Sequence, residues 1–208
     1  MIVVGITGHL GTGKSTVAAM FAQAGAAVIN ADLLAHHGMR PGGACFKRIV
    51  RAFGRQILVQ GQIDRKKLGA IVFSPKAGRR VKLKKLEAMI HPFVIRETQK
   101  QLRSLKKAGK RIVILDVPLL FESGMDHFAD LTLVVKTNAR VQLRRCSRQR
   151  RLSPLEARQR MRFQLPLAEK IRRADLVIDN NGTIHATRKQ VKDIGNMIQR
   201  RYLKTTQQ

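Results

Sequence analysis

One short segment near the N-terminus constrains the fold more than any other feature of the sequence. Residues 5–16 read GITGHLGTGKST and directly follow the apolar run Ile2–Val4. From Gly8 to Ser15 they match the pattern Gly-x-x-x-x-Gly-Lys-Ser of the phosphate-binding P-loop. That loop requires an apolar strand before it and a helix after it. The sequence therefore predicts a strand, a P-loop and an amphipathic helix in this order.

The residue types in this loop suit a nucleoside triphosphate. Glycines let successive backbone N–H groups turn toward phosphate oxygens, and the N-terminus of the following helix adds partial positive charge. Lys14 is predicted to reach the β- and γ-phosphates, and the Ser15 hydroxyl is predicted to bind Mg²⁺. An ordinary glycine-rich turn is the alternative, and the complete pattern in this context disfavours it. The predicted ATP-binding residues of the loop are Gly8, Gly11, Thr12, Gly13, Lys14, Ser15 and Thr16.

The charge of the chain indicates acidic partners. Its 41 Lys and Arg residues against 13 Asp and Glu residues give a formal net charge of +28. Basic runs such as residues 79–85 and 106–111 lie outside any motif and are typical of solvated faces. An excess of this size also attracts nucleic acid or anionic membranes without specificity. Aromatic residues make up only 4% of the chain, without a cluster of stacking residues, which disfavours a dedicated RNA reader.

Composition narrows the protein class further. No stretch approaches the roughly 18 uninterrupted apolar residues of a membrane span, and the N-terminus lacks the charged region and cleavage site of a secretory signal. We therefore expect a cytoplasmic protein without a membrane span. Cys45 and Cys146 are far apart and form no Cys-x-x-Cys pair, so neither a zinc nor a redox site is predicted.

The apolar runs predict an α/β fold. Helical patterns separate most of the runs, which favours a parallel five-stranded sheet of the P-loop NTPase type, flanked by helices on both faces. The first helix is predicted over Lys14–Ala24, and a closing helix over about 183–201. The predicted strands are residues 2–7, 26–31, 111–116, 131–135 and 175–179.

Two regions interrupt this sheet. Residues 35–110 contain no comparable β-branched run and show helical patterns at 45–53, 65–73 and 75–108, so they predict a helical insertion. The His91-Pro92 step is expected to interrupt or kink the last of these helices. A basic helical region at 144–173 is predicted as a lid, with a new helix beginning at Ser153-Pro154. The nucleotide-binding core is then assigned to residues 1–34, 111–143 and 174–203.

Two of the few acidic residues follow predicted strands. Asp32 ends the second strand, and Asp116 ends the strand at 111–116. In a parallel sheet the carboxyl ends of the strands are where ligands bind. Asp116 is in the Walker B position and is predicted to hold Mg²⁺ directly or through water, with a strand-end cap as the alternative. Asp32 either accepts a proton from an attacking hydroxyl or caps the helix that follows it, and the residues alone leave both readings open.

Arginines of the predicted lid are candidates for contact with ATP. Phosphoryl transfer spreads negative charge over the γ-phosphate oxygens, so a kinase needs cations that arrive as the site closes. Arg144 and Arg148 stand one helical turn apart, and Arg160 lies further along the basic segment 144–164. We take Arg148 and Arg160 as the candidate ATP contacts; a solvated basic helix pair is the alternative.

The motifs together resemble those of the dephospho-CoA kinase family, in the order of that family and over nearly the whole chain. The P-loop is common to many NTPases, whereas the segment LDVPLLFESG, the His-Pro step and the segment ADLVIDNNGT are far more specific. The matching segments are residues 5–18, 29–32, 61–73, 91–92, 115–124, 152–164 and 174–183.

The resemblance implies a P-loop kinase core with a helical CoA-binding insertion and a lid. It implies transfer of the γ-phosphate of ATP, with Mg²⁺, to the 3′-hydroxyl of dephospho-CoA, the last step of coenzyme A synthesis. It makes Asp32 the expected catalytic base and keeps Lys14 in its P-loop role. It places Asn180 and Gly182 against the adenine of ATP. The residues that it assigns to the acceptor are Asp32, Arg65, His91, Pro118, Leu119 and Glu122.

Three positions depart from the family pattern. Many members carry Gly where this chain has His9 and Asp where it has Asn30. The arginine that the family places in the lid corresponds to Gln149, between two other arginines, so the arginine that contacts ATP is left open. Two alternatives stand beside this reading: a kinase acting on a nucleoside or nucleoside monophosphate, and a basic P-loop NTPase associated with nucleic acid, which accounts better for the charge.

Overall fold

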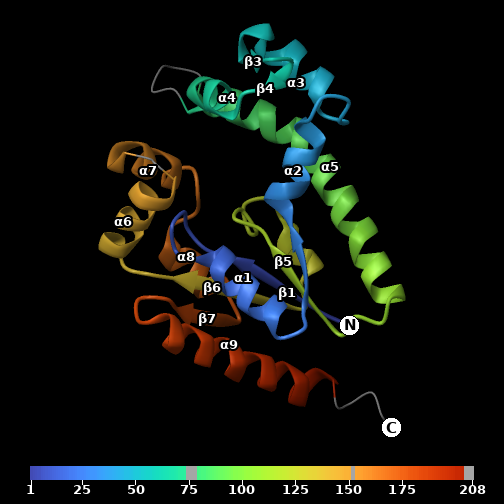
Figure 1. Cartoon of the computed structure of the whole chain (residues 1–208), viewed down its shortest axis with the longest axis vertical. Coiled ribbons are helices and arrows are strands. Elements are labelled where there is room, and N and C mark those ends of the chain that lie inside the picture. Colours follow the sequence, from blue (N-terminus) through green and yellow to red (C-terminus); the bar gives the residue numbers. More distant parts are fainter. Residues whose placement is uncertain (74–78, 151–152, 204–208) are drawn as a thin grey trace. The chain divides into compact units, whose positions relative to one another are not determined.

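The chain folds into two units that are described separately. The computed structural model describes residues 1–73, 79–150 and 153–203. The first unit comprises Met1–Asn30 and the chain from Gln101 onward, and the second comprises Ala31–Lys100. The elements of both are labelled in Figure 1. The sequence-based division into a core, an insertion at 35–110 and a lid at 144–173 stays a prediction.

A parallel five-stranded sheet forms the centre of the first unit, as the sequence predicted. The strand order is β2-β5-β1-β6-β7, and each neighbouring pair is parallel. Because neighbouring strands are parallel, each connection between them must cross from one end of the sheet to the other, and helices make these crossovers. The strands are β1 Ile2–Thr7, β2 Ala27–Asn30, β5 Ile112–Asp116, β6 Leu131–Lys136 and β7 Leu176–Asp179.

Two helices cover one face of this sheet. Alternate residues of the strands, such as Val4 and Ile6 of β1, join one buried cluster with residues of α1 (Lys14–Gln23) and α9 (Ile184–Ile198). Burying side chains of this size contributes about 1.5–3 kcal/mol each. Figure 1 shows α1 and α9, in blue and red, on the sheet. This packing holds the strand ends, and thus the loops that follow them, in fixed positions.

Three short helices occupy the predicted lid region. They are α6 Ala139–Arg150, α7 Pro154–Met161 and α8 Leu167–Arg173. The predicted helix start at Pro154 is confirmed. Short 3₁₀- and π-helical turns follow β5 and α9, at Met125–Phe128 and Gln199–Leu203.

The second unit is helical around its own core. The core is formed by buried side chains of α3 and α4 and of the turn between them, and residues of α5 pack against it. Asp64 caps α4, because its carboxylate accepts the N–H groups of Lys66 and Lys67 at 2.7 and 2.9 Å. The elements are α2 Ala31–Met39, α3 Phe46–Phe53, a 3₁₀ turn Arg55–Ile57, α4 Arg65–Val72 and α5 Arg79–Lys107, of which the part from Gln101 belongs to the first unit.

Helix α5 passes through Pro92 without a break, so of the two outcomes predicted at the His91-Pro92 step the interruption is wrong and the kink stays a prediction. A proline inside a helix removes one backbone donor and crowds the preceding turn. Packing on the next residues offsets this cost. Val94 is buried, and the ring of Phe93 lies so close to Gly38 that a Cβ there would meet it at 2.8 Å.

A small hairpin in the second unit was missed from the sequence. Strands β3 Leu58–Val59 and β4 Gln62–Ile63 pair antiparallel across Gln60 and Gly61. Both turn residues have positive φ, 48° and 75°, as the two-residue turns of hairpins require. Strands this short leave almost no alternating pattern in the sequence, and Gly61 was the one local signal.

Candidate active site

The P-loop joins β1 to α1 and is packed tightly at three of its glycines. A Cβ at Gly8 would lie 2.5 Å from the Val135 carbonyl oxygen. Gly11 and Gly13 have φ values of 81° and 90°, a region that other residues adopt at a cost. A Cβ at Gly11 would lie 2.7 Å from the Cys146 sulfur, and one at Gly13 would lie 2.1 Å from the Asn180 side-chain nitrogen. Both positions therefore require glycine, for backbone conformation and for space.

Asn180 and Arg145 hold the loop from the side. The Asn180 amide donates to the Thr12 carbonyl at 2.7 Å and accepts from the Thr187 hydroxyl at 2.9 Å. The Arg145 guanidinium donates to the carbonyls of Thr12 and Asn180 at 3.3 and 3.2 Å. Gly182 follows Asn180 by two residues and is exposed. Sequence reasoning missed Arg145 as a P-loop contact, because nothing local distinguishes it from the neighbouring arginines.

Lys14 and Asp116 meet at the carboxyl edge of the sheet. The Lys14 ammonium forms an ion pair with one oxygen of Asp116, whose side chain is only 1% exposed. The other oxygen accepts from the Asn30 amide at 2.9 Å. The P-loop lysine and the Walker B aspartate, distant in the chain, are therefore brought together by the pairing of β1 with β5.

The donors near this pair fit magnesium. Mg²⁺ usually binds through one or two carboxylates together with water and nucleotide phosphates. Asp116 supplies a carboxylate at the strand end, and Ser15 supplies an exposed hydroxyl in the first turn of α1, with Thr16 beside it. These residues suit a metal that arrives with the nucleotide.

The segment after β5 carries predicted acceptor residues but makes internal contacts. The Pro118 carbonyl accepts from the Thr7 hydroxyl at 3.0 Å, and the Leu119 carbonyl accepts the N–H of Ser123 at 2.9 Å. Glu122 pairs with the Lys170 ammonium at 2.9 Å. The first contact ties the segment to the end of β1, and the last ties it to α8.

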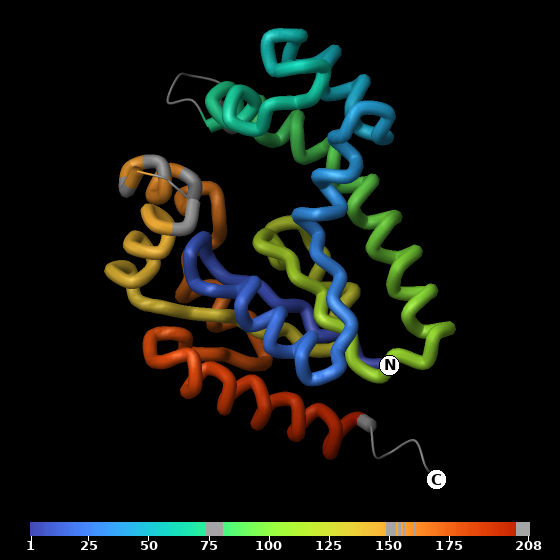
Figure 2. The backbone as a smooth tube through the Cα atoms, viewed as in Figure 1, coloured from blue at the N-terminus to red at the C-terminus, as the bar shows by residue number. Residues whose placement is uncertain are grey.

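His9 links the P-loop to the chain that returns from α7 to α8. Its Nε2 lies 2.7 Å from the Leu165 carbonyl, and the neighbouring Leu10 N–H donates to the Gln164 side chain at 3.3 Å. Figure 2 shows this dark blue loop next to the orange return segment. Burial holds the pKa of His9 below its ordinary value; the Leu165 carbonyl and Glu122 oppose this shift, and Lys170 adds to it. The imidazole is therefore held neutral.

This lowered pKa predicts a pH dependence of stability. The unfolded chain binds the His9 proton more tightly, so the contribution of His9 is complete above the unfolded pKa of about 6.5 and is lost as pH falls toward the folded value. Burial also lowers the pKa of His91, which acts in the same direction. We expect the melting temperature to fall between pH 7.5 and 5.0, and to fall less in His9→Gln.

Thermal melts at the two pH values measure this effect. His185→Gln is the matched control, because His185 lies exposed on α9. The control should keep the full pH dependence of the wild type. An identical fall in His9→Gln and His185→Gln would contradict a neutral, buried His9.

The second unit carries three of the predicted acceptor residues. Asp32 is exposed in the first turn of α2, which begins at Ala31, so Asp32 is not the N-cap that the alternative reading required. Burial lowers the pKa of His36; Arg65 adds to the lowering, and Asp32 opposes it. Asp32 and Arg65 therefore lie near the same imidazole. His91 is half-buried in α5.

The candidate lid arginines are described in part. Arg144 and Arg148 are both exposed on α6. Arg160 belongs to α7, but its side chain lies outside the described part of the structure, as do those of Gln149 and Arg150. Among the lid arginines whose side chains the structure describes, Arg145 is bonded to the P-loop, through the Thr12 carbonyl.

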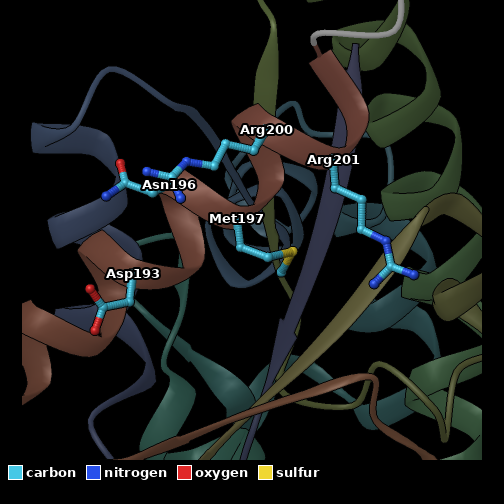
Figure 3. A pocket seen from close by; sticks show the side chains of 5 residues that line it. All are labelled: Asp193, Asn196, Met197, Arg200 and Arg201. Carbon is cyan, nitrogen blue, oxygen red and sulfur yellow. The ribbon is translucent and has the colours of Figure 1, made fainter.

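A surface hollow lies at the C-terminal end of α9 and includes none of these residues. Figure 3 shows its lining side chains, all from α9 and the π-helical turn that follows. They are Asp193, Asn196, Met197, Arg200 and Arg201.

Among the described residues, no helix is both long enough and apolar enough to cross a bilayer.

Comparison with known proteins decides the family. The model of the family described as dephospho-CoA kinase matches residues 2–186. The chain belongs to the dephospho-CoA kinase family. It is 46% identical to the dephospho-CoA kinase of Geobacillus kaustophilus over 191 residues, which cover 91% of this chain and 93% of that one. It is 45% identical to that of Symbiobacterium thermophilum over 193 residues, covering 92% and 79%.

Solved structures agree with this assignment. A crystal structure from Thermus thermophilus matches with a TM-score of 0.79 and 34% identity, over 95% of this chain and 97% of that one. The dephospho-CoA kinase of Campylobacter jejuni matches with a TM-score of 0.68 and 28% identity, over 95% and 97%. A shikimate kinase from Acinetobacter baumannii, at 16% identity and a TM-score of 0.52 over 100% and 96%, shows the shared P-loop fold alone.

Membership of the dephospho-CoA kinase family defines the reaction class. The chain is a kinase that transfers phosphate from ATP to dephospho-CoA, the final step of coenzyme A biosynthesis. The family predicted from the sequence motifs is thereby confirmed. The predicted roles of individual residues are a separate matter.

Proposed function

We propose that the P-loop unit binds ATP so that its γ-phosphate is transferred to the 3′-hydroxyl of dephospho-CoA. The main support for this proposal is the ion pair between Lys14 and the buried Asp116 at the carboxyl edge of the sheet. In the proposal, the Lys14 ammonium moves from Asp116 to the β- and γ-phosphates when ATP binds. Backbone N–H groups of Gly8, Gly11, Gly13 and their neighbours then surround the phosphates.

Asp116 and Ser15 are proposed as the residues that would hold a magnesium ion arriving with the nucleotide. When bound, such an ion would offset negative charge on the phosphate oxygens. Asn30 orients Asp116 through its 2.9 Å hydrogen bond. At position 30, where the family pattern often has Asp, this chain has an uncharged amide, which leaves one carboxylate rather than two near the acceptor hydroxyl.

The base for the acceptor hydroxyl is proposed to be Asp32. Its exposed carboxylate in the first turn of α2 is open to a substrate. Arg65 is proposed to pair with a phosphate of the acceptor, and His91 to line the acceptor site. Pro118, Leu119 and Glu122 are proposed to shape that site from the segment after β5.

The remaining ATP contacts are assigned to the predicted lid and the loop after β7. Arg148 and Arg160 are proposed to supply cations to the phosphates as the lid closes. Asn180 and Gly182 are proposed to lie against the adenine; the bond of the buried Asn180 side chain to the Thr12 carbonyl holds their loop beside the P-loop. We also propose a cytoplasmic location, because the reaction consumes ATP, which that compartment supplies.

An acceptor assay tests the proposed function. We expect Mg²⁺-dependent conversion of dephospho-CoA to CoA, with AMP, CMP and adenosine poorer acceptors by about two orders of magnitude or more. The long arm of dephospho-CoA provides binding energy that orients the reacting hydroxyl, so its loss should lower kcat as well as affinity. ADP release is measured with each acceptor at matched concentration. The product mass shows that one phosphate was added, and its release by a 3′-nucleotidase shows that it is on the 3′-hydroxyl.

Three results would contradict the proposal. Preference for a nucleoside monophosphate would favour the alternative kinase. ATP hydrolysis stimulated only by RNA would favour the nucleic-acid reading that the net charge of +28 suggests. Equal activity with and without Mg²⁺, after treatment with a chelator, would contradict the metal site of Asp116 and Ser15.

A further inference from the structure

A lysine is completely buried behind the P-loop. The Lys170 side chain of α8 is 0% exposed, and burial lowers its pKa while Glu122 opposes the shift. Burying an ammonium group is costly unless it is paired and hydrogen-bonded. The ammonium meets the Glu122 carboxylate at 2.9 Å, the Pro118 carbonyl at 2.8 Å and the Thr7 hydroxyl at 3.4 Å. Its three N–H donors therefore have three acceptors.

These acceptors belong to the segments that carry the proposed chemistry. Thr7 is the last residue of β1 and directly precedes Gly8 of the P-loop. Pro118 follows Asp116 of β5 by two residues. One buried cation thus bridges the start of the P-loop and the chain just beyond the Walker B aspartate.

Glu122 extends this bridge to the chain that returns from α7. The oxygen that pairs with Lys170 also accepts the N–H of Leu165 at 2.8 Å. The carbonyl of Leu165 is in turn bonded to His9 of the P-loop at 2.7 Å. The return segment is therefore held on both sides, by Glu122 and by His9.

The ion pair between Lys170 and Glu122 is not an efficient way to stabilise a fold. Within the described residues, the second oxygen of Glu122 is buried without a hydrogen-bond partner. A buried ion pair that is incompletely satisfied is often no better for stability than an apolar pair of the same size. The arrangement does fix the relative positions of three segments, which an apolar contact would define less sharply.

We propose that Lys170 and Glu122 are a positioning pair that holds the return segment of the predicted lid, residues 162–166, against the start of the P-loop. This inference rests on the proposed ATP site. Cations stabilise a transition state only when they are held in place before the reaction. Loosening the return segment lets α6 and α7 vary in position, so their cations meet the transferred phosphate less often.

The test compares a single and a double variant. Lys170→Met keeps the aliphatic length but leaves the Glu122 charge buried without its cation, so the melting temperature should fall by about 10 °C. Lys170→Met/Glu122→Gln removes both charges and should recover at least half of this fall. At 25 °C and saturating dephospho-CoA the double variant should still show a kcat about tenfold below wild type. Its KM for dephospho-CoA should stay within about threefold, because a lost acceptor contact of Glu122, unlike a loosened return segment, would raise that KM. Its Kd for ADP should stay within about threefold, because the phosphate-binding residues of the P-loop are intact.

A matched pair on the same helix provides the control. Arg172 pairs with Glu169 at 2.8 Å, and its side chain is 76% exposed. Arg172→Met/Glu169→Gln likewise removes one cation and one carboxylate, at the surface, and also removes the pairing of Glu169 with Arg173 at 2.7 Å. We expect less than about 2 °C of change in melting temperature and no change in kcat.

The outcomes separate this inference from the proposed function. A wild-type protein that does not bind ADP or does not phosphorylate dephospho-CoA contradicts the proposed function itself. With an active wild type, a double variant with wild-type kcat would show that the pair is only structural. A double variant that fails to fold would also overturn the inference, because the neutral pair is expected to support the fold.

Discussion

Lys14→Met should lower the rate of phosphoryl transfer by at least about two orders of magnitude. Lys14 is proposed to balance charge on the β- and γ-phosphates, and losing one preorganised charge-stabilising group costs about a hundred- to a thousandfold in kcat. The Met side chain keeps the aliphatic packing of the P-loop lysine. The measurement is kcat and KM for ATP at saturating dephospho-CoA and 25 °C.

Stability must be followed in the same experiment. Asp116 is buried and loses its cation in Lys14→Met, so we also expect a lower melting temperature. Circular dichroism at 25 °C confirms that the assayed variant is folded. Lys189→Met is the control, because the Lys189 ammonium pairs with Asp193 on the exposed surface of α9. Turnover near the wild-type rate in folded Lys14→Met would refute the proposed role of the P-loop lysine.

Asp32→Asn should reduce kcat about a hundredfold while the fold is retained. A general base contributes about 10²- to 10⁴-fold, and the amide cannot take the proton of the acceptor hydroxyl. The side chain keeps its size, and Asp32 is exposed. An acid in the first turn of a helix gains little from the helix dipole when it faces water, so the melting temperature should change by less than about 2 °C.

Asp193→Asn is the control for Asp32→Asn. It removes one negative charge at a different surface position, so it shows what a general loss of negative charge does to kcat. Asp193 is an exposed carboxylate on α9, paired with Lys189 at 3.0 Å. This control should retain wild-type kcat and KM. If Asp32→Asn keeps its turnover but loses stability, Asp32 serves the helix rather than the reaction.

Local patterns explain why much of the first unit could be predicted. Strands buried on both faces read as continuous apolar runs, and β1 was predicted at its observed bounds, Ile2–Thr7. The P-loop is a contiguous motif, so its glycines and Lys14 were identified without tertiary information. The position of Asp116 alongside the P-loop followed from one further rule, that ligands bind at the carboxyl ends of parallel strands; its ion pair with Lys14 was not predicted.

The failures share a physical cause. The continuity of α5 through Pro92 depends on packing around Phe93 and Val94, which the sequence does not display. The role of Arg145 depends on carbonyls that are distant in the chain. In each case a contact between segments outweighed the local preference of a residue.

Sequence by itself determined the parts of this protein that depend on short-range chemistry. These are the P-loop, the apolar strands, the order of the elements and the motifs of the dephospho-CoA kinase family. Each rests on backbone geometry or side-chain periodicity within a few residues.

Only the tertiary structure decided which polar groups share the buried space around the P-loop. It showed Asn180 bonded to Thr12, and Lys170 paired with Glu122. A basic residue in a short helix is normally expected at the surface, as Arg172 is. Whether such a charge can be buried depends on acceptors supplied by other segments, and their meeting is a property of the folded chain alone.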